Sequence, residues 1–313
     1  MNVIHVQAPG LLTTVQDRGR EGFGPLGISP SGAADPISLQ LGNRLVANPE
    51  SAAGLEMTLL GGTFHFPETA VVSLTGSDFG ATLDGAAVEP WTSVDVRPGQ
   101  TLRLGATRTG ARCYLCVQGG IAVKPFLGSA STHILSGTGG LQGRPLRKGD
   151  VLEIGSSTAP YHRRTIDPHV RDRLSRHGAL RVTPGPQLDW FPESSQHAFY
   201  TAAYRIGEQS NRMGLRLEGP PVLLSAAGQM ITEGVSLGAV QVPSEGLPII
   251  LFVEQQTTGG YPIIANVISA DLHRVGQLRP RDEIRFEQVD FETARSLLIE
   301  QEKLLAIQEL VLE

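Results

Sequence analysis

The sequence predicts a mainly β protein, and three observations support this. Glycine and proline are abundant, at 37 and 21 of the 313 residues, which together exceed their usual share of roughly 12%. Apolar runs are short and end at turn residues, as strands do. Aromatic residues make up only 5% of the chain, so the core is expected to be aliphatic. The length suits two domains, or one large domain with additions.

Short alternating or apolar segments indicate the individual strands. The expected strands are 71–76 (VVSLTG), 101–105 (TLRLG), 113–123 (CYLCVQGGIAV), 151–155 (VLEIG), 248–253 (PIILFV) and 283–287 (EIRFE).

A local pattern occurs three times, as VRPGQTLRLG (96–105), LRKGDVLEIG (146–155) and LRPRDEIRFE (278–287). Each copy has an arginine, a two-residue turn and a polar residue before an alternating strand. We interpret each copy as a turn that starts a strand at the border of a sheet. The two later copies are expected to close two related β domains, although so short a repeat also arises by chance.

Few helices are expected. Asp35-Pro36 begins one, because aspartate accepts hydrogen bonds from the first amides of a helix and proline fits its first position. The pairs at 48–49 (Asn-Pro) and 167–168 (Asp-Pro) predict two further short helices in the same way. The longest candidate helix is 290–313, where leucines and a valine recur every seven residues.

A polar, basic and strand-poor stretch at 156–178 marks the expected boundary between two β-rich halves. We therefore divide the chain into an N-terminal β domain (1–165), a C-terminal β domain (166–289) and a C-terminal helix (290–313).

Composition argues against several classes of partner. The net charge is −5, and only three lysines are present, so no basic patch interleaved with aromatics suggests nucleic acid. No basic amphipathic stretch or long apolar run suggests a membrane. Two cysteines and no visible secretory signal favour a reducing compartment, and the cytoplasm is the simplest assignment.

Two familiar nucleotide- and metal-binding motifs are absent. The sequence has no GxxxxGK[ST] or HExxH pattern, and no metal site is expected. Cys113 and Cys116 form a single CxxC, which lacks the second pair that zinc requires, so both are expected to be buried apolar residues on opposite faces of a strand. The glycine-rich segment 136–145 misses the dinucleotide-binding spacing; it predicts a flexible loop that carries Arg144, or a loop that covers a ligand.

Four segments combine small residues with short hydrogen-bonding groups at expected strand ends. They are TTVQDRG (13–19), GISPSGAAD (27–35), SNRMGLRLEG (210–219) and EQQTTGGYP (254–262), the last directly after the apolar run 247–253. Each residue alone has a simpler structural interpretation, such as a turn, a helix cap or an edge strand. Together they suggest polar loops that converge on one ligand cleft.

The sequence resembles the family of allophanate-hydrolase-subunit-2-like proteins. The resemblance rests on the segments TTVQDRGREGFGPLGISPSGAAD, GSASTHILSGTGGLQGRPLRKGD, SNRMGLRLEG, EGVSLGAVQVPSEGLPII and QTTGGYPIIANVISADL, and it extends from Val3 to about Phe286. This family includes the C subunit of 5-oxoprolinase, the antagonist of the Kip kinase inhibitor and the carboxyltransferase part of urea carboxylase.

The resemblance implies two cyclophilin-like β-barrel domains. It also implies a role as the C component of an ATP-dependent 5-oxoprolinase, which opens the lactam of 5-oxo-L-proline to L-glutamate. The implied partners are a LamB/YcsF-like A component and a B component similar to the Kip inhibitor. ATP with magnesium would be used by the complex, with a site not assigned to this chain.

Within this resemblance, the chemistry of lactam opening suggests site residues. It requires donors for developing negative charge and a carboxylate that steers water. The candidate catalytic residues are Glu254, Glu233 and Arg212. The candidate substrate-binding residues are Asp17, Arg18, Ser31, Asn211, Gln241, Gln256, Thr257, Thr258, Tyr261 and Arg144.

Three positions depart from the family pattern: Val253-Glu254 where Ala-Asp is usual, Ala130 in place of an arginine, and Arg281 in place of a turn glycine. Two alternatives to the oxoprolinase interpretation also remain. One is the carboxyltransferase component of a urea carboxylase or allophanate-hydrolase-like system, with biotin carried on another polypeptide. The other is a Kip-type regulatory protein that binds a kinase inhibitor.

Overall fold

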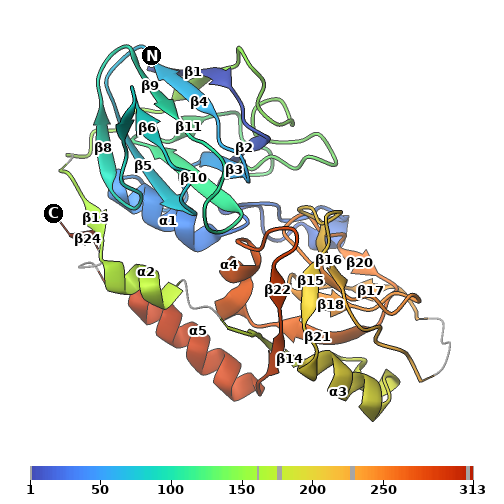
Figure 1. Cartoon of the computed structure of the whole chain (residues 1–313). Helices are drawn as coiled ribbons and strands as arrows, with labels where there is room; N and C mark the ends of the chain where they lie inside the picture. Colours follow the sequence, from blue (N-terminus) through green and yellow to red (C-terminus); the bar gives the residue numbers. More distant parts are fainter. Residues whose placement is uncertain (1, 161, 175–177, 226–229, 308–310, 313) are drawn as a thin grey trace. The chain divides into compact units, whose positions relative to one another are not determined.

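The computed structural model describes residues 2–160, 162–174, 178–225, 230–307 and 311–312 (Figure 1). The chain divides into two compact units. Unit 1 comprises Met1–Arg20, Ser31–Leu174 and Gln308–Glu313, and unit 2 comprises Glu21–Pro30 and Ser175–Ile307. The division lies further along the chain than the sequence boundary at 165/166. It also assigns residues 21–30 to the second unit, where Ser29 Oγ donates a hydrogen bond to Val253 O at 3.0 Å.

Unit 1 is built mainly from two antiparallel sheets (Figure 1), and buried aliphatic residues together with Phe64, Phe66 and Phe79 form their core. The seven-stranded sheet has the order β11 (Ile121–Ala122), β12 (Val151–Ile154), β1 (Val3–Ala8), β4 (Thr63–Phe66), β9 (Gln100–Arg103), β6 (Thr82–Leu83) and β7 (Ala86–Ala87). The five-stranded sheet has the order β2 (Leu12–Gln16), β3 (Gly54–Thr58), β10 (Arg112–Val117), β5 (Ala70–Gly76) and β8 (Ser93–Val96). A short pair of β13 (Thr165–Ile166) with β24 (Val311–Leu312) completes the unit. Buried residues of both sheets, such as Phe64, Leu102 and Leu115, belong to one core cluster.

Helix α1 (Pro36–Leu45) packs on β5 and β10 of the five-stranded sheet, as Figure 1 shows. Asp35 caps it, accepting hydrogen bonds from Ser38 N at 3.0 Å and Ser38 Oγ at 2.6 Å, as the sequence predicted. The Tyr114 hydroxyl accepts from Asp35 N and donates to Glu56, which also binds Ala34 N. Burial, with the nearby carboxylates, raises the pKa of Tyr114 well above its ordinary value, so this hydroxyl stays a hydrogen-bond donor.

Unit 2 contains an eight-stranded, nearly closed barrel sheet. Its order is β22 (Glu283–Ile284), β15 (Tyr204–Ile206), β16 (Gly214–Glu218), β19 (Ile249–Leu251), β18 (Ala239–Gln241), β21 (Ile263–Val267), β14 (Leu180–Pro184) and β23 (Phe286–Gln288). The two edge strands, β22 and β23, are separated along the chain only by Arg285. The same short segment therefore forms both edges, which closes the sheet on itself. Strands β17 (Glu233–Gly234) and β20 (Thr258–Gly259) form a separate pair.

Unit 2 also contains several short helices and one long helix. They are η1 (Gly24–Leu26), η2 (Leu188–Trp190), α3 (Glu193–Thr201), η3 (Ser269–Asp271), α4 (Leu272–Val275) and α5 (Phe291–Ala306); α2 (Pro168–Leu174) belongs to unit 1. Phe199 of α3 stacks on Phe286 of β23 with ring centroids 4.5 Å apart. Gln301 of α5 donates to Ala270 O at 2.9 Å, which joins α5 to η3.

The mainly β prediction is confirmed, and several element predictions need correction. The helix expected at 49 does not form. The residues around position 49 form turns instead, and β3 starts at Gly54 because residues 54–58 pair with the neighbouring strands of the sheet. The C-terminal helix begins as predicted, with Asp290 accepting from Thr293 N, but it ends at Ala306. Residues 311–312 are instead strand β24, and residues 308–310 and 313 lie outside the described residues. Helix α3 was not predicted.

Cys113 and Cys116 are buried on opposite sides of β10, as predicted. Cys113 belongs to the main core cluster of unit 1, whereas Cys116 packs among the residues beneath α1. Burial raises the pKa of both thiols, that of Cys116 to about 12, so they remain neutral core groups at physiological pH. No helix in the described parts of the chain has the length and apolarity needed to cross a bilayer.

The three copies of the repeated pattern form the same turn. Residues Gly99, Gly149 and Arg281 occupy its left-handed position, with φ of +85°, +91° and +74°. In each copy the polar residue that follows accepts a hydrogen bond from the backbone N–H of the arginine three residues earlier, at 2.7–2.8 Å. The shared geometry shows that the pattern is a structural device. In the third copy, arginine carries backbone strain that glycine avoids.

Replacing Arg281 with glycine should therefore stabilise unit 2. The exposed ion pair of Arg281 with Glu208 confounds a direct comparison, so the substitution is made in a Glu208→Gln background. There, Arg281→Gly should raise the free energy of unfolding by about 1 kcal/mol. Gly99→Ala, at the equivalent position in open space, should lower it by about the same amount. Urea denaturation measures the free energy of unfolding of both variants. A loss of stability on Arg281→Gly would show that arginine carries no backbone strain at this position.

Asp271 anchors the η3–α4 region and makes stability depend on pH. Burial raises its pKa, but hydrogen bonds from Arg181 and the charge of Arg274 outweigh that effect, so its pKa lies below the ordinary value. Its stabilising contribution is therefore full above about pH 4 and is lost as pH falls through the lower folded-state pKa. Asp271→Asn should cost about 3 kcal/mol at pH 7, and this difference should shrink in acid.

The measurement follows Trp190 fluorescence in a Trp91→Phe background, because Trp190 lies in unit 2 and Trp91 in unit 1. The control is Glu208→Gln, which removes an exposed ion pair and should cost less than about 1 kcal/mol. A difference between wild type and Asp271→Asn that stays constant from pH 7 down to pH 3 would contradict the linkage.

Candidate functional site

A buried ion pair lies where the apolar strand β19 ends. Arg212 Nε donates to Glu254 Oε1 at 2.5 Å, and Glu254 N donates to Arg212 O at 2.8 Å. The two side chains are only 4% and 3% exposed. Removing one partner from a buried pair is costly because the other charge remains in a poorly solvated position. The pair therefore ties the segment before β16 to the segment after β19.

Three further predicted residues, Glu233, Gln241 and Gln256, lie together with Gln187, which the sequence analysis did not single out; we call these four residues the carboxamide cluster. Gln256 Nε2 donates to Gln241 Oε1 at 3.3 Å, and Gln241 Nε2 donates to Tyr261 O at 3.3 Å. Gln187 Nε2 lies 3.5 Å from Glu233 Oε2, and its Oε1 accepts from Ile263 N at 3.1 Å. Gln241 and Gln187 are buried, whereas Gln256 and Glu233 are exposed.

The β17–β20 pair carries the exposed part of this cluster. Glu233 pairs in register with Gly259, and Gly234 pairs with Thr258. Thr257 O accepts from Val235 N at 3.1 Å. A Cβ at Gly259 would lie 2.4 Å from Gln241 Nε2, so only glycine lets this strand approach the buried amide. The polar segment predicted at 254–262 thus presents amide and hydroxyl groups next to the Glu233 carboxylate on the paired strand β17, with Tyr261 about half exposed.

Asp17 is a structural centre of unit 1. Its carboxylate accepts hydrogen bonds from Gly19 N, Ser129 Oγ, Ala130 N and Ser131 Oγ at 2.5–2.8 Å. It is buried and its acceptor positions are occupied, so it joins the 17–19 turn to the 129–131 loop. The two serines were not singled out from the sequence, and Ala130 was noted only as a departure from the family pattern, because their contacts with Asp17 span more than 110 residues.

Other predicted residues in both units are engaged in local structure. Ser31 is buried with φ +55°, and its Oγ donates to Thr132 O at 2.7 Å. Arg144 makes two hydrogen bonds of 2.8 Å to the carboxylate of Asp150, which holds it against its own turn. Asn211 Oδ1 accepts from Met213 N at 2.8 Å, and Arg18 is exposed.

The glycine-rich segment does not fit a nucleotide phosphate. A Cβ at Gly139, Gly140 or Gly143 would lie within 2.0 Å of Ser131 O, Thr132 Oγ1 or Gly137 O, respectively. Glycine at these positions therefore allows other atoms of the same chain to pack closely against the backbone. A phosphate cradle instead directs open backbone N–H groups outward.

Within each unit, the structure thus separates the predicted residues into groups with different chemistry. Arg212 and Glu254 neutralise each other in a buried pair, and Asp17 is saturated by donors. The carboxamide cluster alone combines buried, fixed amides with an exposed carboxylate, a combination that can orient a small polar ligand and exchange a proton with it. Gln187 was missed because its segment, PGPQLDW, has no local pattern and meets Glu233 and Ile263 only through the fold.

Comparison with known proteins places this architecture in a family. A family model described as "Carboxyltransferase domain, subdomain A and B" matches residues 26–288. The C subunit of 5-oxoprolinase from Escherichia coli is 40% identical over 91% of this chain and 91% of its own. That of Haemophilus influenzae is 36% identical, over 91% and 90%. The urea amidolyase of Saccharomyces cerevisiae is 33% identical over 94% of this chain but only 17% of its own length.

Solved structures agree with the sequence comparison. The crystal structure of the K. lactis urea amidolyase matches with a TM-score of 0.90 and 31% identity, over 99% of this chain and 20% of that one. That of TTHA0988 matches with a TM-score of 0.79 and 35% identity, over 92% and 56%. The family model and these relatives cover nearly the whole chain, so this protein belongs to the carboxyltransferase family defined by subdomains A and B.

Proposed function

We propose that this chain is the C subunit of a 5-oxoprolinase, which opens 5-oxo-L-proline to L-glutamate. The observation that carries this proposal is the 40% identity to a protein of that name, over 91% of both chains. A second relative of the same name is 36% identical over a similar span.

The carboxamide cluster suits a small lactam. A lactam has one N–H donor and one carbonyl acceptor, and a glutamine side chain offers the complementary acceptor and donors. Gln241 is held by Tyr261 O and Gln256, so its orientation is fixed before a ligand arrives. Glu233 is exposed beside Gln187 and supplies a carboxylate that can steer water to the carbonyl carbon.

The buried Arg212–Glu254 pair supports this cluster indirectly. Both charges already face each other within the protein, so we assign the pair a positioning role and Glu233 the proton-transfer role. Glu254 directly precedes Gln255 and Gln256 along the chain, and fixing Glu254 therefore fixes the start of the segment that carries Gln256 and Thr257.

The finer parts of the proposal concern the assembly. We assign ATP hydrolysis with magnesium to a complex of this chain with a LamB/YcsF-like A component and a B component similar to the Kip inhibitor. The glycine-rich segment does not suit a nucleotide phosphate, so we do not assign the site of the reaction's ATP to that segment. The buried Cys113 and Cys116, free thiols within the described chain, suit the reducing cytoplasm.

A second candidate is a carboxyltransferase component that acts on urea or a similar amide. It is favoured by the TM-score of 0.90 to a urea amidolyase and by the description of the family model. An amide substrate would use the same donors and acceptors of the carboxamide cluster, so the two candidates differ in substrate and in the need for a carboxylated biotin carrier.

Reconstitution separates the two candidates. The chain is combined with the A and B components of a 5-oxoprolinase, and glutamate and ADP are measured. We expect glutamate release that depends on all three chains and on ATP. An inactive mixture with 5-oxo-L-proline, together with carboxyl transfer to urea when a carboxylated biotin carrier is added, would favour the carboxyltransferase.

Two substitutions test the assigned roles in the reconstituted enzyme. Glu233→Gln should lower kcat by at least about 100-fold, because it removes a proton acceptor, without lowering the Tm. Glu254→Gln should instead lower the free energy of unfolding by about 3 kcal/mol, because Arg212 loses its buried counter-charge.

Glu254→Asp, which keeps the charge, should recover part of that stability. Glu245→Gln, at an exposed position of unit 2, is the matched control and should change neither quantity. Full activity of Glu233→Gln would remove Glu233 from the chemistry.

A further inference from the structure

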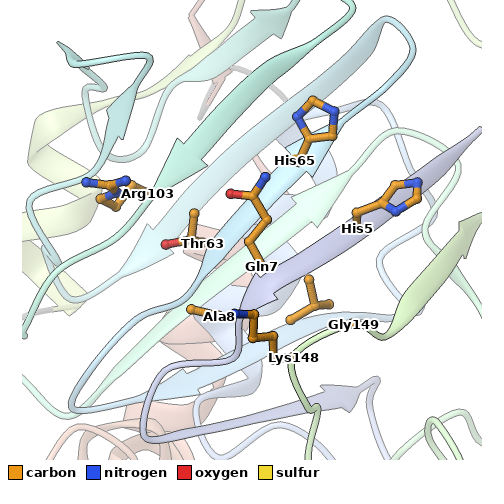
Figure 2. Close-up of a pocket in the computed structure, with 9 residues that line it drawn as sticks. His5, Gln7, Ala8, Thr63, His65, Arg103, Lys148 and Gly149 are labelled. Atoms are coloured by element: carbon orange, nitrogen blue, oxygen red, sulfur yellow. The ribbon is translucent and has the colours of Figure 1, made fainter.

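Unit 1 carries a hollow on the outer face of its seven-stranded sheet, separate from every residue assigned above. Its volume is about 650 Å³, and Figure 2 shows the side chains that line it. The polar members are His5 and Gln7 of β1, Thr63 and His65 of β4, Arg103 of β9, and Lys148 of the turn before β12. They alternate along their strands with buried core residues such as Ile4, Val6, Phe64 and Leu102. The pleat therefore directs these side chains outward.

Strand register fixes the positions of the lining residues. His5 is directly opposite His65, and their ring centroids are 6.1 Å apart. Thr63 is directly opposite Arg103 on the next strand. His65 Nδ1 lies 3.3 Å from Thr101 Oγ1, which restrains that ring. Because the three strands belong to one continuous sheet, the backbone positions of their lining residues are fixed without the aid of a flexible loop.

The lining is strongly cationic although the protein is acidic overall. Arg103 and Lys148 carry fixed positive charges, His5 and His65 gain charge when protonated, and no carboxylate is among the described lining residues. The nearest turn contains Asp150, but that carboxylate is bound to Arg144 and to Arg147 N. Because the chain has more carboxylates than lysine and arginine side chains, a surface patch taken at random would more often contain a carboxylate than lack one beside two such cations.

We propose that this hollow binds a phosphate-bearing anion. The donors come from three strands and a turn: a guanidinium that can bind two oxygens, an ammonium, two imidazoles, an amide and a hydroxyl (Figure 2). A tetrahedral dianion accepts from several directions at once, whereas one planar carboxylate is satisfied by a single arginine. The hollow exceeds the size of one phosphate, which leaves room for a second phosphate or for the group that carries it.

A metal ion fits the same lining less well. Two imidazoles would be its ligands, with Arg103 and Lys148 repelling it. The described residues hold no group of three or more His, Cys, Asp or Glu side chains arranged for a metal.

Calorimetric titration of the full chain at low salt tests the proposal, with inorganic pyrophosphate, ADP and adenosine as probes. We expect one saturable site for pyrophosphate and for ADP and none for adenosine. Tighter binding of ADP would identify a nucleotide as the source of the phosphate, and equal binding would identify free polyphosphate. Absence of saturable binding by both phosphate probes would overturn the proposal.

Adjacent residues of one turn provide a matched pair of variants. Lys148→Gln and Arg147→Gln remove the same charge, but only Lys148 lines the hollow. Lys148→Gln should weaken pyrophosphate binding by about fivefold or more, and Arg103→Gln should do the same. Arg147→Gln should change it by less than about twofold. Equal effects at 147 and 148 would show diffuse attraction to surface charge and would overturn the site.

The imidazoles add a pH test, for which sulfate is the probe because its charge is constant between pH 6 and pH 8. Sulfate should bind more tightly at pH 6, because histidine gains charge over this range. The other charged groups near the two rings are Arg103, Lys148 and Arg147, with Glu153 on β12 and Asp84 beyond β9. In the double variant His5→Gln/His65→Gln, the difference in sulfate affinity between pH 6 and pH 8 should disappear. If that difference remained, the two histidines would not be part of the site.

Discussion

Closure of the unit 2 sheet is the constraint on which the rest of that unit depends. Strands β22 and β23 lie at opposite edges of the eight-stranded order, yet only Arg285 separates them along the chain. The backbone N–H and C=O groups of the edges are therefore engaged around a nearly complete circle. Apolar residues such as Leu251, Ala239 and Ile263 form a buried cluster on this sheet. Polar groups with a chemical role are left to strand ends and to the β17–β20 pair, where the carboxamide cluster is found.

Buried charges in this protein mainly hold segments together. Arg212 with Glu254, Arg181 with Asp271, and the saturated carboxylate of Asp17 each join parts of the chain that are far apart in sequence. Each is bound by its own partners within one unit. A side chain that is held in such a contact is a poor general base and a poor hydrogen-bond donor to an anion. The reaction would first have to break a contact that is shielded from water. Under the function proposed above, this physical distinction favours the exposed Glu233 over the buried Glu254 as the proton-transfer group.

The sequence was most informative where the signal is local. Asp35 as a helix cap, the left-handed turn position at 99, 149 and 281, and the opposite faces of Cys113 and Cys116 follow from stereochemistry within a few residues. The sequence was misleading where contacts between residues far apart in the chain determine the local structure. Asn48-Pro49 has the form of a helix start, but the following residues pair with β2 and β10. The contacts of Gln187 with distant residues, and those of Asp17 with residues 129–131, form only when the chain folds. The family resemblance identified the polar segments, but not which of their members are structural.

In the function proposed above, the carboxamide cluster of unit 2, preformed by the closed sheet, binds the lactam. Crystals of the chain assembled with its partner proteins and soaked with 5-oxo-L-proline would show where the ligand lies. We expect density for the ligand within hydrogen-bonding distance of Gln241 and Gln256, with Glu233 Oε atoms facing its carbonyl carbon. Ligand density elsewhere, with the carboxamide cluster in contact only with solvent or with another protein of the complex, would contradict it.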